Sequence, residues 1–241
     1  MLLLEDKYAK MVGLFNRFVR NSKQFGTDDC SGGCYEVTEL ADHLYYHASE
    51  YNLGKLTIGC GVSKAVLISD ALDCVLKVPF NGMYSDSYDE ETEDYESIWE
   101  GFYCGGGDYS DDYCAAEEGI YQMAVKYGVE RMFAKTEYFC DLKCGIPVYK
   151  QTRVVTYGNS KHKEATPASL ETIKSKYRYA CRCANDWCAL VIDCYGEEFF
   201  KKFINFIEYV CPEVGEDMHG GNYGYTLDGK PVLLDYSGWG N

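Results

Sequence analysis

The segments Asp217-Met-His-Gly-Gly-Asn222 and Asp235-Tyr-Ser-Gly238, separated by twelve residues, decide how we interpret this chain. A carboxylate and a carboxamide five residues apart on one loop can reach the same ligand. The aspartate can orient or deprotonate an attacking hydroxyl, and the amide oxygen can bind a divalent cation. Asp235 then offers the metal a second carboxylate. Asp228-Gly229 lies between the segments and is typical of a hairpin turn, so we expect the loop and Asp235 to lie side by side.

Length and charge set the first limits on function. The chain has 241 residues, of which 46% are hydrophobic, so it can bury a core as one domain or as two small lobes. Its formal net charge is -15. A protein that follows a phosphate backbone needs a basic face, so this acidity argues against direct nucleic-acid binding. It is compatible with the opposite idea, a mimic of nucleic acid that occupies a basic partner.

The cysteines indicate a reducing compartment. Thirteen cysteines would suggest disulfide bonds in a small secreted protein, but no signal-peptide pattern opens this sequence. No segment approaches the roughly 20 consecutive apolar residues of a membrane span, so we expect no membrane association. An odd number of cysteines also fits poorly with complete pairing. We therefore expect a cytoplasmic protein with reduced thiols.

A zinc site is an alternative use for Cys30, Cys34, His43 and His47. The histidines are four residues apart on an expected helix, and the two cysteines precede it. The helix has its own amphipathic pattern, however, and the two cysteines are separated only by Ser-Gly-Gly. We favour ordinary thiols and surface imidazoles.

The first part of the chain reads as helices followed by strands. Apolar residues at three- and four-residue steps predict a helix over residues 3–22 and a second over 36–51, both covering a sheet. From Lys55 the period becomes that of strands. The expected order is strand, glycine turn, strand, strand, over residues 56–58, 59–64, 65–68 and 74–80.

The glycine turn and the third strand carry candidate phosphate-binding groups. Gly59 and Gly61 let backbone N–H groups approach phosphate oxygens without a Cβ in the way. Lys77 projects from the third strand, where a lysine among apolar residues is costly unless an anion compensates its charge. It would supply a positive charge to the α and β phosphates.

Taken in this order, the residues resemble the protein kinase-like fold over about residues 53–241. The resemblance extends to the small early serine/threonine protein kinases of lytic podoviruses, which share a Phe/Glu-Asp-Met-His-Ser/Gly-Gly-Asn type of loop. It implies ATP and Mg²⁺ as cofactors. It also implies phosphorylation of protein substrates, host proteins among them, in the host cytoplasm if the chain is phage-encoded. The residues that carry it are Gly59, Gly61, Lys77, Asp217, Asn222 and Asp235.

The resemblance assigns a role to each of these residues. Asp217 is implied as the catalytic base, and Asn222 and Asp235 as the metal ligands. Lys77 is implied as the phosphate anchor. Kinase-like sites hold this lysine with a helix glutamate, for which we choose Glu117 over its neighbour Glu118 on the helix expected over residues 113–127. The alternative is that both glutamates are solvated.

The sequence departs from the family pattern at three places. Lys64 replaces the third glycine, and Tyr236-Ser237 stands where Phe-Gly is usual. Gly215 and Glu216 replace the His and Arg that precede the catalytic aspartate, so we expect no switching by a phosphorylated activation loop. The sequence ends six residues after Asp235, so it is either a truncated piece or a minimal form that recognises its substrate elsewhere.

An acidic insertion interrupts the first lobe over residues 81–112. It holds eleven Asp and Glu between Tyr84 and Cys114 and no Lys or Arg. So long a connection is typically disordered or functional, and we expect a solvated loop, with docking to a basic partner as the alternative. Two further strands are expected over residues 129–139 and 147–155, which completes a five-stranded sheet.

We therefore expect an α+β protein with a two-lobed kinase-like fold and a five-stranded antiparallel N-lobe sheet. The expected parts are an N-terminal helical extension, an N-lobe and a reduced helical C-lobe, over residues 1–52, 53–157 and 158–241. The expected activity is that of an ATP- and Mg²⁺-dependent serine/threonine protein kinase. Two alternatives stay open: a catalytically idle kinase fold that binds a host protein, and a small-molecule kinase of the aminoglycoside or choline type.

Overall fold

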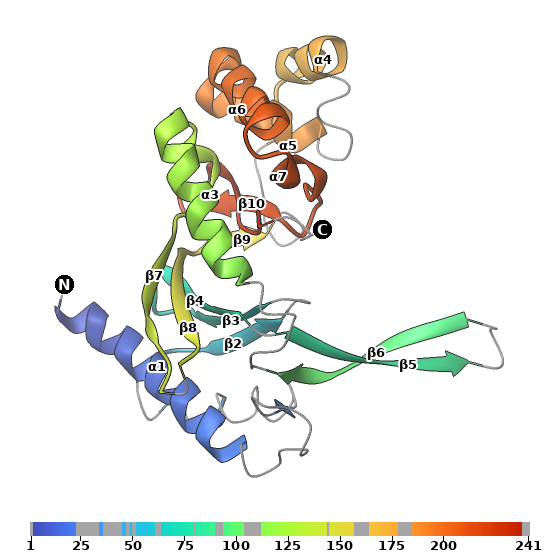
Figure 1. Ribbon diagram of the computed structural model, residues 1–241. Helices are drawn as coiled ribbons and strands as arrows, with labels where there is room; N and C mark the ends of the chain where they lie inside the picture. The colour runs from blue at the N-terminus through green and yellow to red at the C-terminus, as the bar shows by residue number, and fades with distance from the viewer. Residues whose placement is uncertain are drawn as a thin grey trace. The chain divides into compact units, whose positions relative to one another are not determined.

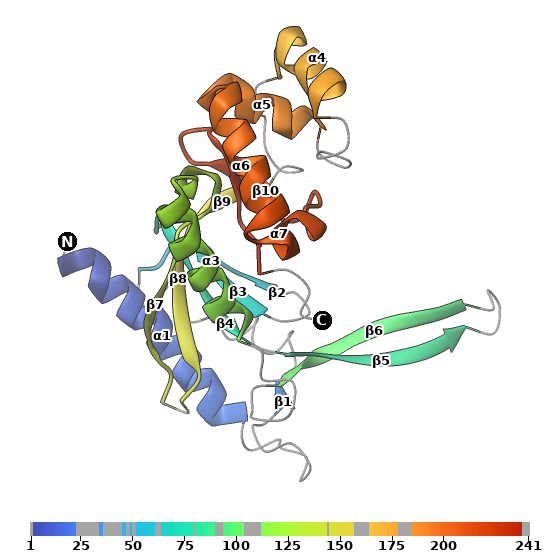
Figure 2. The same ribbon diagram turned by 45° about the horizontal axis from the view of Figure 1, so that its top comes forward.

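The chain forms two compact units in the computed structural model (Figures 1 and 2). The first comprises residues 1–114 and 137–151, and the second residues 115–136 and 152–241. The helix expected over residues 113–127 falls almost entirely in the second unit. The structure describes residues 2–22, 34–35, 45–46, 49, 52–60, 64–79, 81–89, 94–103, 112–143, 145–156, 164–177 and 185–237.

A five-stranded antiparallel sheet with strand order β2-β3-β4-β8-β7 forms the centre of the first unit, and confirms the expected α+β class. Each of the three strands expected between residues 56 and 80 is present. The expected strand over residues 129–139 is wrong in its first half, because residues 130–132 form a 3-10 helix and the strand begins only at Thr136. The strands are β2 (Leu56–Cys60), β3 (Lys64–Ser69), β4 (Cys74–Pro79), β7 (Thr136–Asp141) and β8 (Pro147–Thr152).

Helix α1 (Leu2–Ser22) packs on one face of this sheet, as the amphipathic pattern predicts (Figure 1). Its Met11, Leu14 and Phe15 are buried against strand residues that include Leu67 and Leu76. Polar groups fix its position. The Tyr8 hydroxyl donates to Asp73 Oδ1 at 2.8 Å, and the main-chain N–H of Cys74 donates to that hydroxyl at 3.0 Å.

The acidic insertion is not the loop that we expected. Figures 1 and 2 show a long two-stranded ribbon formed by β5 (Asn81–Asp89) and β6 (Asp94–Tyr103). Strand β1 (Cys34–Tyr35) pairs with β6 to complete a separate three-stranded sheet. The expectation weighed the charge and the length of the insertion, whereas tyrosine, isoleucine and tryptophan in this stretch favour strands. The other residues of the insertion, 90–93 and 104–111, lie outside the described residues.

The second unit combines helices with a three-stranded sheet of order β11-β10-β9. The predicted hairpin is confirmed, because β10 and β11 pair antiparallel across a turn in which Gly229 has φ +82°. The strands are β9 (Val154–Thr156), β10 (Tyr223–Thr226) and β11 (Pro231–Leu233). The helices are α3 (Tyr113–Tyr127), η3 (Glu130–Met132), α4 (Pro167–Lys176), α5 (Asn185–Tyr195), α6 (Glu197–Tyr209) and α7 (Pro212–Glu216).

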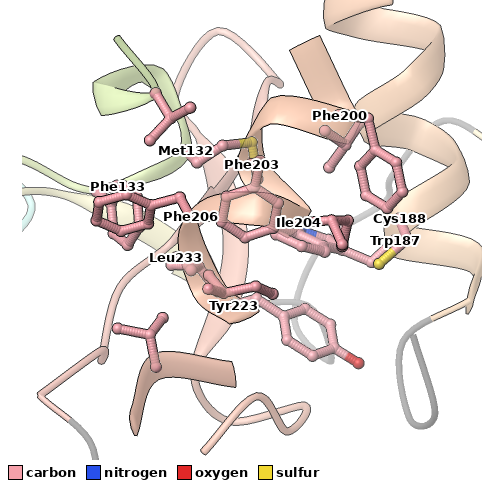
Figure 3. Packing of buried hydrophobic residues seen from close by; sticks show 14 of the residues in the cluster. Met132, Phe133, Trp187, Cys188, Phe200, Phe203, Ile204, Phe206, Tyr223 and Leu233 are labelled. Carbon is pink, nitrogen blue, oxygen red and sulfur yellow. The ribbon is translucent and has the colours of Figure 1, made fainter. Parts of the chain in front are cut away.

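The core of this unit is rich in aromatic side chains (Figure 3). Phe203 and Phe206 of α6 pack edge-on against Phe133, with ring centroids 6.1 and 5.7 Å apart. Trp187 of α5 lies 5.0 Å from the ring of Tyr223, and its indole N–H donates to the carbonyl of Gly224 at 3.2 Å. The helices therefore hold β10, and with it the loop that precedes β10.

Some expectations fall where the structure gives no description. The residues proposed for zinc lie outside it, apart from Cys34 in β1, and so does nearly all of the helix expected over residues 36–51. In the parts of the chain that are described, no helix is both long and apolar enough to cross a bilayer.

Gly224 generates a test of this packing. A Cβ at this position would lie 2.2 Å from the carbonyl oxygen of Val155 on the neighbouring strand β9, so the backbone must move. Gly224→Ala is expected to lower the free energy of unfolding by about 1–3 kcal/mol, measured by urea denaturation. Gly119→Ala is the matched control, because no atom lies within 4 Å of its added Cβ. The control should raise stability by up to about 1 kcal/mol, as helix propensity requires. Equal midpoints for Gly224→Ala and wild type would contradict the register of β9 and β10.

Candidate functional site

The loop that carries Asp217 is positioned by the helices before it and the hairpin after it. Helix α6 buries Phe200, Phe203 and Phe206, and the short α7 packs back on α6. Asp217 is the first residue after α7. Within the loop, the N–H of His219 donates to the Asp217 carbonyl at 3.0 Å, and the N–H of Asn222 donates to the His219 carbonyl at 2.9 Å. The loop is therefore a set of tight turns that leads directly into β10.

Asp217 and Asn222 are joined by two hydrogen bonds in a nearly buried setting. The Nδ2 of Asn222 donates to the main-chain oxygen of Asp217 at 2.8 Å and to its carboxylate Oδ2 at 2.9 Å. Only 9% of Asp217 and 6% of Asn222 is exposed. A buried carboxylate needs such donors to remain favourable. These two side chains therefore lie close together, as predicted.

The same bonds fix the orientation of the Asn222 carboxamide. Both groups that face its inner end are acceptors, so that end must be the amide nitrogen. The carbonyl end, Oδ1, therefore faces the opposite way, and amide oxygens of this kind are ligands for Mg²⁺ or Ca²⁺. The loop presents one oriented neutral oxygen ligand next to one carboxylate.

Asp235 is brought to the same loop by the hairpin. The N–H groups of Leu234 and Asp235 donate to the carbonyl of Asn222 at 2.9 and 3.4 Å. Residue 222 thus contacts Asp217 through its side chain and Asp235 through its main chain. In the described residues, no group of three or more histidine, cysteine or carboxylate side chains could hold a metal ion by itself. Mg²⁺ is commonly held by one or two carboxylates together with substrate phosphates, and the donors here suit that mode.

His219 lies at the open side of the loop. Its Nδ1 accepts the N–H of Gly221 at 3.1 Å, so the neutral imidazole carries its proton on Nε2. Nε2 is 3.7 Å from Asp217 Oδ1, and the imidazole is largely exposed. The separation is too long for a strong hydrogen bond. His219 therefore adds only a weak interaction to the carboxylate.

Glu117 points into the protein, and its neighbour Glu118 is half-exposed. The Oε2 of Glu117 accepts a hydrogen bond from the hydroxyl of Thr136 at 3.3 Å. Thr136 in turn lies 2.9 Å from the hydroxyl of Tyr236, the residue after Asp235. Glu117 is thus connected to the Asp235 segment within the second unit.

Lys77 is buried on β4 of the first unit. It pairs across the strands with Val66, and Lys64 lies two residues before Val66, so both lysines occupy the same face of the sheet. Lys64 is buried as well. Burying an ammonium group is costly unless negative charge or hydrogen bonds compensate it. The pairing of Lys77 with Glu117 of the second unit stays a prediction.

The glycine turn is described only at its edges. Gly59 lies within β2 opposite Val66, and Lys64 begins β3. Gly61 lies outside the described residues. The turn expected over residues 59–64 is therefore too long at both ends, because Gly59 and Cys60 belong to β2 and Lys64 to β3, and residues 61–63 lie outside the described residues.

Cys211, immediately before α7, takes no part in thiolate chemistry. Burial, with a smaller contribution from Glu213, raises the pKa of its thiol to about 11. The group is protonated at neutral pH and packs in the aromatic core of the second unit. Cys211 is therefore a packing residue and not a candidate ligand or nucleophile for this loop.

Comparison with known proteins leaves the site to be judged by its own geometry. No protein-family model matches the chain, and no curated protein matches its sequence significantly.

Three residues of the region were not singled out as functional by the sequence. Lys64 was noted only as a departure from the glycine pattern, although a lysine that begins an apolar strand signals the same burial cost as Lys77. Tyr236 was noted only as a replacement for phenylalanine. Thr136 carried no signal, because its contacts are with residues 19 and 100 positions away.

A substitution at Asn222 tests the hydrogen bonds between Asn222 and Asp217. Asn222→Asp replaces the donor with a carboxylate that faces a carbonyl and a second carboxylate. We expect a loss of at least about 2 kcal/mol in the free energy of unfolding at pH 7, since two buried bonds become repulsions. The loss should shrink as the pH falls toward about 4, where a protonated carboxyl can donate again. Asn205→Asp, at a half-buried position on α6, is the control. A pH-independent loss would contradict the carboxylate contact.

Proposed function

We propose that the protein is an ATP- and Mg²⁺-dependent phosphotransferase that acts on serine and threonine hydroxyls of proteins. The observation that supports it most is the double hydrogen bond from Asn222 to Asp217, with Asp235 joined to the same asparagine through the main chain. This set combines a proton acceptor with two oxygen ligands on neighbouring segments. Phosphoryl transfer needs this combination, because its catalysis consists mainly of positioning and charge stabilisation.

Each residue has a distinct part in the proposed reaction. Asp217 orients the acceptor hydroxyl and receives its proton as the hydroxyl oxygen bonds to the γ-phosphorus. The bond from that phosphorus to the bridging oxygen of ADP breaks. Bound Mg²⁺ would neutralise the charge on the phosphate oxygens. Asn222 Oδ1 and the Asp235 carboxylate are the residues that would hold it.

The phosphates of ATP need an anchor as well. Lys77, buried in an apolar strand, is the proposed anchor, and Glu117 is the proposed partner that holds it. Lys64 on the same sheet face adds positive charge. The resemblance described above extends the proposal to host proteins as substrates and to the cytoplasm as the place of action.

Phosphoryl transfer, measured for the wild type and for an Asp217 variant, tests this function. We expect the pure protein with Mg²⁺ and γ-labelled ATP to phosphorylate itself or proteins of a cell extract, detected by mass spectrometry on serine and threonine. Asp217→Asn keeps an acceptor for Asn222 but removes the base, so transfer should fall by about 10²-fold or more while ATP affinity is kept. Asp228→Asn at the exposed hairpin turn is the matched control and should transfer normally. A wild type that binds Mg·ATP yet modifies neither itself, nor extract proteins, nor small amino-alcohol acceptors would overturn the proposed activity.

The metal ligands are tested by binding. ATP affinity of the wild type should depend on Mg²⁺, and Asp235→Asn should remove most of that dependence because one carboxylate is lost. Titration calorimetry with ATP, with and without Mg²⁺, measures both constants. The Asp228→Asn variant should retain the wild-type difference. Equal Mg²⁺ dependence in Asp235→Asn and wild type would show that the metal binds elsewhere.

A further inference from the structure

Three buried polar side chains of the second unit form a continuous chain of contacts. The Thr136 hydroxyl lies 3.3 Å from Glu117 Oε2 and 2.9 Å from the Tyr236 hydroxyl, and the Tyr236 hydroxyl lies 2.7 Å from the carbonyl oxygen of Ala134. Glu117 and Thr136 are 0% exposed, and Tyr236 is 1% exposed. Groups so fully removed from water need hydrogen-bond partners within the protein.

Counting protons shows that the Thr136–Tyr236 contact can run in two directions. Each hydroxyl carries one proton, and a 2.9 Å oxygen–oxygen contact between Thr136 and Tyr236 requires a proton between them. If Tyr236 donates to Thr136, the threonine proton is available to the Glu117 carboxylate at 3.3 Å or to the Ala134 carbonyl at 3.4 Å. If Thr136 donates to Tyr236, the tyrosine donates to the Ala134 carbonyl, and Glu117 loses the threonine bond. Thr136 can therefore hold Glu117 only when the Tyr236 hydroxyl donates to Thr136.

The segments that carry these groups are fixed to one another. Phe133 forms a parallel bridge with Leu233, and the N–H of Ala134 donates to the Leu233 carbonyl at 2.7 Å. The ring of Phe133 packs edge-on against that of Tyr236, with centroids 5.0 Å apart. Tyr236 directly follows Asp235, the proposed metal ligand. A change in the position of Asp235 is thus transmitted to the hydroxyl that faces Thr136.

We infer that Thr136 and Tyr236 are positioning residues that couple the Asp235 segment to Glu117 through their two hydroxyls. The inference rests on the proposed function, in which Glu117 holds the phosphate-anchoring lysine. A phenylalanine at position 236 would fill the same space, but it has no hydroxyl and could not form these contacts. The device makes the position of Glu117 depend on the state of the Asp235 segment.

Protein unfolding tests the hydroxyl contacts without reference to activity. Thr136→Val and Tyr236→Phe each remove one hydroxyl and keep the shape, and each should lower the midpoint of thermal unfolding. If the hydroxyls act as one chain, the double variant should shift the midpoint by less than the sum of the single shifts. Thr172→Val, at a half-buried position on α4, and Tyr209→Phe, at an exposed position on α6, form the control pair and should be additive. Additive shifts for Thr136 and Tyr236 would overturn the coupling.

Kinetics test the positioning role. Thr136→Val is expected to lower kcat/KM for Mg·ATP about tenfold, through KM for ATP as well as kcat, while Thr136→Ser, which retains the hydroxyl, should recover most of it. Tyr236→Phe should fall between Thr136→Val and wild type. An active wild type whose Thr136→Val variant keeps both constants would overturn the positioning role alone. An inactive wild type would overturn the proposed function and the positioning role together, and non-additive unfolding would then support only the structural contact.

Discussion

The candidate site depends on the carboxamide of Asn222, whose nitrogen binds the main chain and the side chain of Asp217 at once. Together these two hydrogen bonds fix the carboxylate, orient the amide oxygen and close the loop. The carbonyl of the same residue receives the N–H groups of Leu234 and Asp235. Three separate pieces of backbone are therefore held relative to one another by one asparagine, and its burial protects these bonds from competition by water.

The remainder of the second unit serves to keep this asparagine in place. Its main chain continues into β10, which is fixed on one side by β9 and on the other by β11. The close approach of β9 requires the absence of a side chain at Gly224, and the carbonyl of that glycine accepts the indole N–H of Trp187. The aromatic packing of α6 on Phe133 then connects this sheet to the segment that carries Thr136. A site whose groups must be held at fixed positions needs rigid support, because small displacements of the reacting groups are costly.

Local patterns predicted much of this from the sequence. The Asp228-Gly229 turn, α1, α3 and the strands around Lys77 follow from periodicity and turn chemistry that neighbouring residues determine. Glu117 is buried and Glu118 is half-exposed, which agrees with the choice of Glu117. The ribbon of residues 81–103 was missed because high charge was taken to outweigh strand propensity. The contact of Thr136 with Tyr236 spans 100 residues, and only the folded chain shows which threonine meets which tyrosine.

The free-energy cost of burying polar groups bears on whether the protein is catalytically idle. Glu117, Thr136, Asp217 and Asn222 are buried in a unit whose core is otherwise apolar and aromatic. Well-packed apolar residues of similar volume often give equal or greater stability than such groups, so stability alone does not explain their presence. A fold that only displayed a surface to a partner would have no use for a carboxylate held by a carboxamide, or for two hydroxyls leading to a second carboxylate. The proposed chemistry at Asp217 would give both sets of groups a reason to be buried and ordered, and this is why we propose catalysis before an idle scaffold.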